Sequence, residues 1–326
     1  MTIQITIIGL GQIGTSIGLS LANETERIKR VGHDRALDVQ NKAKKMGAFD
    51  VVNFNLPSAV EEADVVVLSI PFDQVEETLK LIAPDLREDA VVMDFSPQKV
   101  VVKKWFDQHV PAGRHYIGLV PSINSEFLLQ PNKGIESARA DLFEKTTIGI
   151  TSAPGMPGLA LQLADDLLKL LGAKSIFLDM HEADGMLMLT HYLPQMMSVG
   201  LLNATVGQSG WREARRFAGR TYAMSTAPID DDPIEALEQA LLNNPVAATR
   251  VLDMAIGALT HLRDAVNKGD EADLEKRLHL ASEDHANWLK ERQRAEWDDA
   301  GKAEIPSAGD TIKRIFLGNR SKRKDK

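Results

Sequence analysis

A glycine-rich turn near the N-terminus has the spacing of a loop that binds a phosphate. An apolar, β-rich run over residues 2–8 leads into the pattern G-x-G-x-x-G, and small and apolar residues follow over 15–22. Between a strand and a helix, the first glycine permits a tight turn, the second lets the backbone approach a pyrophosphate, and the third lets the helix pack closely on the strand. The N–H groups at the helix start would bind the anion. The residues predicted to bind this part of a dinucleotide are Gly9, Gly11, Gln12, Ile13 and Gly14.

An acid at the end of the next predicted strand indicates which dinucleotide is bound. The strand over residues 28–33 leads into Asp34, twenty residues beyond Gly14. A carboxylate at this place accepts hydrogen bonds from the ribose hydroxyls and repels a 2′-phosphate, which favours NAD over NADP. Arg35 leaves NADP open, because a guanidinium beside the ribose would hold a phosphate.

A histidine on a long apolar segment is the candidate for proton transfer. Residues 182–205 predict one long, mostly buried helix that is interrupted by Pro194, and His191 is the only histidine on it. Imidazole accepts a proton near neutral pH, and Gln195 lies one helical turn away. The competing interpretation is a hydrogen-bonded core histidine. His115, just before the strand predicted over 116–119, is a second candidate for the base. The other histidines show no metal-ligand spacing with an acid, and the chain has no cysteine, so we expect no metal site.

The remaining pattern of the first half predicts a parallel sheet that would position these groups. Its apolar runs are continuous, as in strands covered on both faces, and amphipathic helices are predicted over 72–86 and 156–171. Further strands are predicted over 65–71, 90–93, 116–119, 147–151 and 174–178. In such sheets, ligands bind beyond the carboxyl ends of the strands. The pocket edges are therefore predicted at Ser69, Ile70, Pro71 and Ser96 and at residues 121–124.

Beyond residue 179 the strand signals stop, and only helices are predicted. The segment Asp232-Pro233-Ile234-Glu235 predicts a helix start with Asp232 as its cap, and further helices are predicted after Asn244 and Gly269. Long apolar helices in a cofactor enzyme often bury a subunit interface. We therefore expect a homodimer formed through helices within 182–205 and 233–266.

The expected fold is an α/β protein with a Rossmann-type parallel-sheet domain followed by an all-helical substrate and dimerisation domain. The predicted ranges are 1–179 for the dinucleotide-binding domain, 180–312 for the helical domain and 313–326 for a basic tail. The net charge is −8, yet the tail alone holds seven basic residues and one acid. An acidic body argues against nucleic-acid binding. Without cysteines or a membrane-length apolar run, a cytoplasmic protein with no membrane contact is expected.

With these parts placed, the chain resembles the prephenate and arogenate dehydrogenases of tyrosine biosynthesis over roughly residues 4–293. Besides the glycine turn, the matching residues are Asp34, Ser69-Ile70-Pro71, Asp94 and Lys99. Residues 211–218 are similar to the family's arginine motif, F-R-D-x-x-R-x-A. The resemblance implies an NAD-dependent oxidative decarboxylation of a small cyclohexadienyl dicarboxylate. It also implies that Arg216 binds a substrate carboxylate; the competing interpretation is a surface ion pair.

The chain departs from the family pattern where the catalytic base is expected. The segment that resembles G-G-H-P has Val120 in place of the histidine, and the loop serine is replaced by Pro97 with Ser96 adjacent. The segment that resembles S-H-L-P-H has Tyr192 and Gln195 in place of its histidines. Since valine cannot exchange a proton, the predicted catalytic residues are His191, Arg216 and Gln195.

Two other functions stay open from the sequence. A β-hydroxyacid dehydrogenase of similar architecture would carry G-x-x-x-K-x-x-x-N on its first long helix, and residues 182–203 contain no lysine. A non-catalytic or repurposed NAD-binding protein of the same fold is favoured by Val120 and Pro97.

Overall fold

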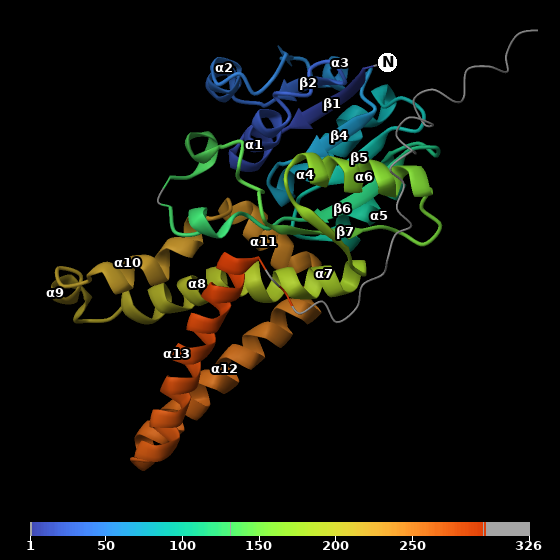
Figure 1. Ribbon diagram of the computed structural model, residues 1–326. Coiled ribbons are helices and arrows are strands. Elements are labelled where there is room, and N and C mark those ends of the chain that lie inside the picture. The colour runs from blue at the N-terminus through green and yellow to red at the C-terminus, as the bar shows by residue number, and fades with distance from the viewer. Residues whose placement is uncertain (1, 131, 296, 298–326) are drawn as a thin grey trace, which may run out of the picture.

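The computed structural model describes residues 2–130, 132–295 and 297 (Figure 1). The predicted basic tail over 313–326 and the end of the predicted helical domain lie outside these residues. The described chain forms one eight-stranded sheet and a set of helices on its faces and below it. The strands are β1 (Ile3–Ile8), β2 (Ile28–His33), β3 (Val51–Val52), β4 (Val65–Leu68), β5 (Val91–Asp94), β6 (His115–Val120), β7 (Thr147–Thr151) and β8 (Lys174–Phe177).

The sheet has the order β3-β2-β1-β4-β5-β6-β7-β8. The pairs from β3 to β6 are parallel, as expected, but β7 runs antiparallel to β6. The connection over 121–146 explains this, because its described residues, all but 131, form 3₁₀ turns at Ser125–Phe127 and Gly134–Ser137 and no crossover α-helix. Without a crossover, the chain re-enters the sheet at the end where it left. The expectation of a wholly parallel sheet is therefore wrong at this one pair.

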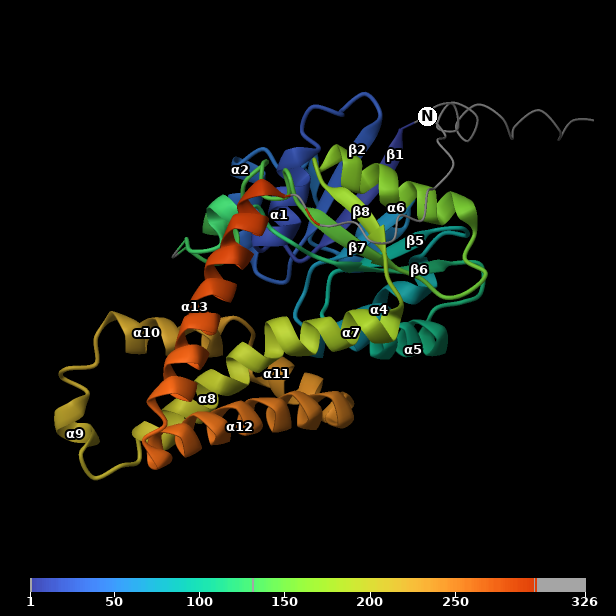
Figure 2. The ribbon, with the colours of Figure 1, turned by 60° about the horizontal axis from the view of Figure 1, so that its bottom comes forward.

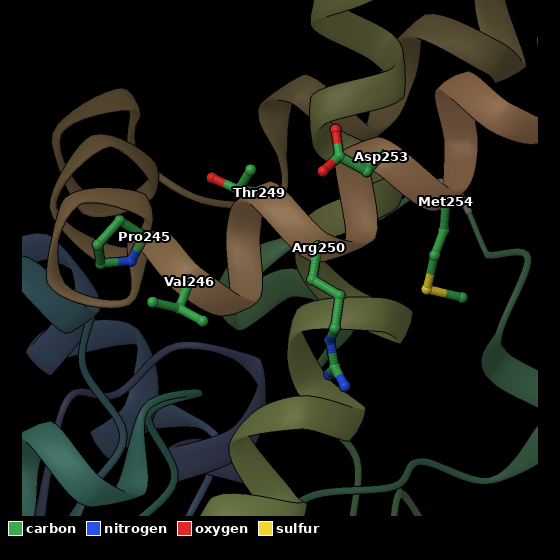
Figure 3. A pocket seen from close by; sticks show the side chains of 6 residues that line it. All are labelled: Pro245, Val246, Thr249, Arg250, Asp253 and Met254. Atoms are coloured by element: carbon green, nitrogen blue, oxygen red, sulfur yellow. The ribbon is translucent and has the colours of Figure 1, made fainter.

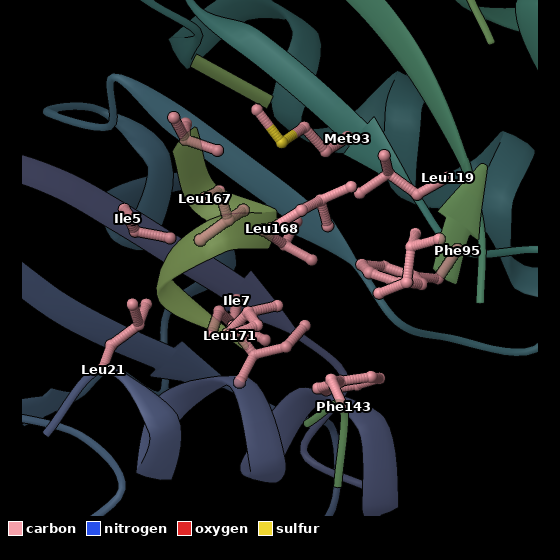
Figure 4. Close-up of a cluster of buried hydrophobic side chains, with 14 of the residues drawn as sticks. Ile5, Ile7, Leu21, Met93, Phe95, Leu119, Phe143, Leu167, Leu168 and Leu171 are labelled. Carbon is pink, nitrogen blue, oxygen red and sulfur yellow. The ribbon is translucent and has the colours of Figure 1, made fainter. Parts of the chain in front are cut away.

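Helices cover both faces of the sheet, because successive side chains of a buried strand point to opposite faces. In β4, Val65 and Val67 lie in the core with α1 and α6, whereas Val66 and Leu68 lie in the core with α4 and α5. Figure 4 shows the first of these cores, with leucines of α6 against β1. The helices of this part are α1 (Gln12–Ser20), α2 (Leu37–Lys45), α3 (Leu56–Val60), α4 (Phe72–Ile82), α5 (Lys99–His109) and α6 (Gly158–Leu170).

The second half of the described chain is helical. Its helices are α7 (Met180–Leu187), α8 (Leu193–Thr205), α9 (Trp211–Ala214), α10 (Arg220–Thr226), α11 (Ile234–Asn243), α12 (Pro245–Lys268) and α13 (Glu271–Arg294). It is joined to the sheet domain where α11 packs on α4 and α7 packs on α5. Helices α12 and α13 extend below the sheet domain, and α9 and α10 extend to one side (Figure 1). Within the described residues, no helix is both long and apolar enough to cross a membrane.

The expected long helix over 182–205 is present, and its interruption has a defined geometry. Between α7 and α8, residues Met188–Tyr192 form a turn of π-helix. Pro194 lies just inside α8 and has no N–H to donate to the preceding turn, so the α-helical hydrogen-bond ladder breaks here. A π turn displaces side chains from their α-helical positions and is frequent at functional sites. His191 lies in this turn.

The predicted helix start near residue 232 is displaced, and its expected cap has another partner. Helix α11 begins at Ile234 with Pro233 as its N-cap and no side-chain cap hydrogen bond. The Asp232 carboxylate instead accepts hydrogen bonds from two side chains of the π turn and α8. The expectation that Asp232 caps this helix is therefore wrong.

Candidate active site

The glycine turn between β1 and α1 has the geometry that the sequence indicated. Gly9 has φ +91°, and a Cβ on it would lie 2.2 Å from the Ser69 carbonyl oxygen. A Cβ on Gly14 would lie 1.9 Å from the Gly9 carbonyl oxygen, so helix and turn are packed against each other. At Gly11, a Cβ would meet no atom within 4 Å, and no side chain caps the start of α1. The backbone at Gly11 is thus accessible from outside, and the first N–H groups of α1 are available to an anion.

Asp34 lies beside this turn at the end of β2. Its carboxylate accepts the Leu10 N–H at 2.8 Å and the Ala36 N–H at 2.9 Å, which fixes its side chain against the glycine turn. The side chain is partly exposed, so lone pairs remain for a ribose. Arg35 is exposed, and the structure gives its guanidinium no hydrogen bond or ion pair to another described residue.

The predicted pocket edge at the carboxyl ends of β4 and β5 also lies next to the glycine turn. The Ser69 N–H donates to the Ile8 carbonyl at 2.8 Å, and the Ile70 side chain lies 2.7 Å from where a Cβ of Gly9 would be. Ser69, Ile70 and Pro71 are partly exposed. Ser96 differs from them, because it is buried and its N–H and Oγ–H both donate to the Asp94 carboxylate, at 2.9 and 2.7 Å. Because its hydroxyl hydrogen is already donated to Asp94, the Ser96 hydroxyl oxygen can only accept a hydrogen bond from a ligand.

A fully buried lysine supports the loop that carries Ser96. The Lys99 ammonium donates to the main-chain carbonyls of Asp94, at 2.8 Å, and of Ser96, and it lies 3.5 Å from the Asp94 carboxylate. Burial lowers the pKa of Lys99, and the charges of Asp94 and Asp184 oppose that effect. Gly118 makes room for the lysine, since a Cβ there would lie 2.7 Å from Lys99 Cδ.

The first helix of the helical domain is bonded directly to this loop. The Asp184 carboxylate on α7 accepts the N–H groups of Lys99 at 2.6 Å and Val100 at 3.1 Å, at the start of α5. A buried carboxylate at a helix N-terminus satisfies N–H groups that have no partner within the helix. The carboxyl end of β5 and the π turn that follows α7 are thereby held in one framework.

His191, the predicted base, has a carboxylate partner that the sequence analysis assigned to another role. His191 Nε2 lies 2.6 Å from Asp232 Oδ2, and Gln195 Nε2 donates to the same oxygen at 2.9 Å. The imidazole is 34% exposed and the carboxylate 21% exposed. The structure thus brings His191 and Gln195 together, and Asp232 is the residue that links them.

The electrostatics of Asp232 determine which imidazole nitrogen carries the proton. Burial alone would raise the pKa of Asp232, but the hydrogen bonds and charge from His191 and Gln195 outweigh it and leave the pKa below its ordinary value. An ionised carboxylate can only accept, so Nε2 of a neutral His191 carries the hydrogen and Nδ1 has the free lone pair. The arrangement can accept a proton at Nδ1 and stabilise the imidazolium through Asp232.

Two buried polar atoms beside this dyad have no hydrogen-bond partner among the described residues. They are the hydroxyl of Tyr192 and Oε1 of Gln195. Burial raises the pKa of Tyr192, and the nearby carboxylates of Asp232, Asp184 and Asp94 raise it further, so its hydroxyl keeps its proton. Buried polar groups are normally hydrogen-bonded, and these two could bond to water or to a ligand.

Arg216 is not brought to His191 within one chain. It follows α9, it is exposed, and its N–H donates to the Glu213 carbonyl at 3.2 Å. Helix α9 lies beyond the far end of α8, whose 13 residues span about 20 Å (Figures 1 and 2). Sequence reasoning had no signal for this separation, because it depends on where the loop after α8 turns.

Val120 ends β6 at the same edge of the sheet as the glycine turn and the Ser96 loop. It pairs with Gly149 of β7 and is partly exposed. His115 lies at the opposite end of β6, where it pairs with Val91.

Comparisons with known proteins agree with this arrangement. A family model described as prephenate dehydrogenase, nucleotide-binding domain, matches residues 17–177. Among curated proteins, the chain is 26% identical over 269 residues to cyclohexadienyl dehydrogenase from Zymomonas mobilis, covering 82% of this chain and 89% of that protein. It is 24% identical over 292 residues to prephenate dehydrogenase from Bacillus subtilis, covering 89% of this chain and 77% of that protein.

Solved structures show the same fold. The crystal structure of prephenate dehydrogenase from A. aeolicus in complex with hydroxyphenyl propionate and NAD⁺ superposes with a TM-score of 0.75 at 19% identity, covering 88% of this chain and 98% of that one. Arogenate dehydrogenase from Synechocystis superposes with a TM-score of 0.68 at 21% identity, covering 88% of this chain and 100% of that one.

Proposed function

The chain belongs to the prephenate dehydrogenase family, and from that premise we propose that it oxidises a cyclohexadienyl dicarboxylate, prephenate or arogenate, with NAD⁺ and with His191 as the base. The observation that carries the proposal is the 2.6 Å contact between Nε2 of His191, which lies on the π turn, and the carboxylate of Asp232, which lies just before α11. It supplies an oriented proton acceptor in a chain that has valine where the family resemblance places a histidine.

The glycine turn fits a nicotinamide dinucleotide. A Cβ on Gly11 would project into open space where a pyrophosphate could approach, and the start of α1 is uncapped. Asp34 would accept the ribose hydroxyls, and Ser69, Ile70 and Pro71 would border the bound group. When bound, the dinucleotide supplies the hydride acceptor, whereas binding and proton transfer are the work of the protein.

The protein's part in the reaction is to accept one proton and to orient two carboxylates. The hydroxyl proton of the substrate passes to His191 Nδ1 as the ring carbon that bears the hydroxyl loses its hydride. Asp232 holds Nε2–H and stabilises the imidazolium that results, and Gln195 holds Asp232. Loss of the ring carboxylate as CO₂ then aromatises the ring.

We propose a homodimer, because the helical domain leaves a large apolar surface uncovered. On α12, the exposed apolar side chains include Val246, Met254, Ile256, Leu259 and Val266. A depression of about 770 Å³ on this helix is lined by Pro245, Val246, Thr249, Arg250, Asp253 and Met254 (Figure 3). Exposed apolar surface of this extent is typical of a subunit interface.

Dimerisation would also give the outlying Arg216 a role. Since Arg216 lies away from His191 in its own chain, it can bind a substrate carboxylate beside a histidine only if the segment after α8 reaches another copy's site. The exposure of Arg216 supports this assembly.

Val120 favours a second function, that of an NAD-binding protein without this activity. The two functions are separated by His191→Asn and Val120→His, each assayed for NADH formation with prephenate and with arogenate. The proposed enzyme loses activity in His191→Asn. A wild type without activity that gains it in Val120→His is a repurposed relative, which contradicts the proposal.

A further inference from the structure

The last turn of α13 reaches back to the sheet domain through one arginine. Figure 2 shows α13 running from the end of α12 up toward the sheet domain. Arg292 Nη1 donates to the Ser122 hydroxyl at 2.6 Å, and Nη2 donates to the Ile123 carbonyl at 2.7 Å. The remainder of this helix is mostly exposed, and none of its residues is fully buried. Arg292 therefore makes the polar contact of α13 with the loop after β6.

The guanidinium of Arg292 is partly buried without a compensating carboxylate. Within the described part of the chain, no carboxylate oxygen lies within 4.0 Å of its nitrogens. Five other arginines of the described chain, by contrast, each form an ion pair with an aspartate. Burial lowers the pKa of Arg292, and no charged neighbour opposes that effect. Removing a cation from water without an anionic partner is unfavourable, so this site would be stabilised by an anion.

The position of Arg292 points to a ligand at the carboxyl edge of the sheet. Ser122 and Ile123 follow Val120 directly, and β6 ends at the same edge as β1, β4 and β5. Ligands of this fold bind beyond that edge. A guanidinium has five N–H donors, of which the two hydrogen bonds to the loop use two. Three donors remain for an incoming group.

We propose that Arg292 binds a carboxylate of the substrate, and that the substrate thereby connects α13 to the nucleotide-binding domain. This inference rests on the proposed function, because it takes the ligand to be a cyclohexadienyl dicarboxylate. Arginine suits the task, since its planar fork matches a carboxylate with two parallel hydrogen bonds. Ser122 and Ile123 act as positioning groups that hold the fork at the edge of the pocket.

The test is calorimetry on the NAD⁺-saturated full chain, titrated with prephenate and separately with arogenate, together with a titration of NAD⁺ itself. Arg292→Gln removes the charge and keeps a polar side chain. Loss of a charge-assisted pair should raise the Kd of the dicarboxylate that the wild type binds by about 10- to 100-fold. Arg292→Lys keeps the charge but loses the planar fork, so its Kd for the dicarboxylate should lie between those of the wild type and Arg292→Gln.

Two controls separate ligand binding from general effects. Arg294→Gln removes an exposed charge from the same turn of α13 and should leave the dicarboxylate Kd within about twofold. A residue that only ties α13 to the sheet domain would not distinguish the dicarboxylate from NAD⁺. A Kd for NAD⁺ that rises in parallel in Arg292→Gln therefore overturns the proposal, as does an unchanged dicarboxylate Kd.

The same titrations distinguish a failure here from a failure of the proposed reaction. A wild type that binds a dicarboxylate but forms no NADH overturns the reaction, and a weaker Kd in Arg292→Gln still supports the arginine. If the wild type forms NADH and Arg292→Gln binds the dicarboxylate with an unchanged Kd, only the proposed role of Arg292 is overturned. A wild type that binds neither dicarboxylate overturns both.

Discussion

At the residue scale, the site is defined by a carboxylate whose sequence context suggested a different use. Asp232 precedes a proline and a helix, which is the usual context of a capping residue. The structure leaves α11 without a side-chain cap and uses this carboxylate to hold His191 and Gln195. A capping hydrogen bond contributes about 1 kcal/mol. The structure forgoes that contribution and places three side chains in contact instead, which favours the proposed role of His191.

The first residue-scale prediction concerns His191. Because removal of a positioned general base costs about 10²–10⁴ in rate, His191→Asn should lower kcat by that factor with little change in the Kd of NAD⁺. Steady-state kinetics and calorimetry give the two quantities, with the exposed His285→Asn as control. Full kcat in His191→Asn would make this histidine a structural residue.

The second residue-scale prediction concerns Asp232 and the stability of the fold in acid. Since the folded-state pKa of Asp232 lies below its ordinary value of 3.8, the unfolded chain binds more protons near and below that pH. The carboxylate therefore stabilises the fold above about pH 3.8, and this contribution is lost as pH falls through the folded value. Asp232→Asn should make the free energy of unfolding fall less steeply in this range, as measured by urea titration. The exposed Asp38→Asn, outside the proposed interface, is the control, and equal slopes for Asp232→Asn and wild type would contradict the assignment.

The third residue-scale prediction concerns Asp34 and the preference for NAD⁺ over NADP⁺. Asp34→Ala removes the acceptor expected for the ribose hydroxyls, and the Kd of NAD⁺ should rise by about one to two orders of magnitude. The neighbouring exposed Asp38→Ala should leave it unchanged. Calorimetry with both dinucleotides decides the point. If the wild type binds NADP⁺ more tightly than NAD⁺, Arg35 rather than Asp34 determines the preference.

At the element scale, two glycines of the β1–α1 turn, Gly14 and Gly11, have separable tasks. Gly14 is required by packing, because its Cβ would lie 1.9 Å from a backbone oxygen that cannot move independently. Gly11 is not required by packing, and its φ of −71° suits any residue. Its smallness matters only if a ligand approaches the backbone there.

This separation gives a matched pair of variants. Gly14→Ala should destabilise the fold by roughly 1–3 kcal/mol through overpacking, as measured by urea unfolding. Gly11→Ala should leave the free energy of unfolding unchanged but raise the Kd of NAD⁺, because its new methyl group projects where the pyrophosphate is expected. Unchanged NAD⁺ affinity in a folded Gly11→Ala would place the cofactor elsewhere.

The extent to which sequence predicts this molecule follows from the range of the interactions involved. The Rossmann-type sheet, the glycine turn and the family were predictable, because apolar periodicity and local spacing determine them. The antiparallel β7 was not, since nothing local shows that residues 121–146 lack a crossover helix. The contact between His191 and Asp232 joins residues 41 positions apart, and Arg292 meets Ser122 across 170 positions. Such pairs have no local signature.

At the scale of the whole molecule, the distribution of apolar surface separates the two domains. The sheet domain encloses its core on both faces, whereas α12 exposes apolar side chains along much of its length. Arg216 and α9 also extend away from the chain's own pocket. Both features are explained if two copies associate through their helical domains.

The prediction is a dimer at micromolar concentration that buries more than about 2,000 Å² in total. Ile256→Lys places a charge on the exposed face of α12 and should yield monomers in light scattering. Leu159→Lys makes the same change at a similarly exposed leucine of α6 in the sheet domain and should leave the dimer intact. A monomeric wild type would rule out the interface.

We propose that this chain catalyses oxidative decarboxylation although it has Val120 where the family resemblance places a histidine. The most direct measurement incubates the purified wild type with NAD⁺ and either prephenate or arogenate, and follows NADH and the aromatic product together. We expect one of the two substrates to yield NADH and aromatic product in equal amounts. Wild type that binds NAD⁺ but forms neither product from either substrate would contradict it.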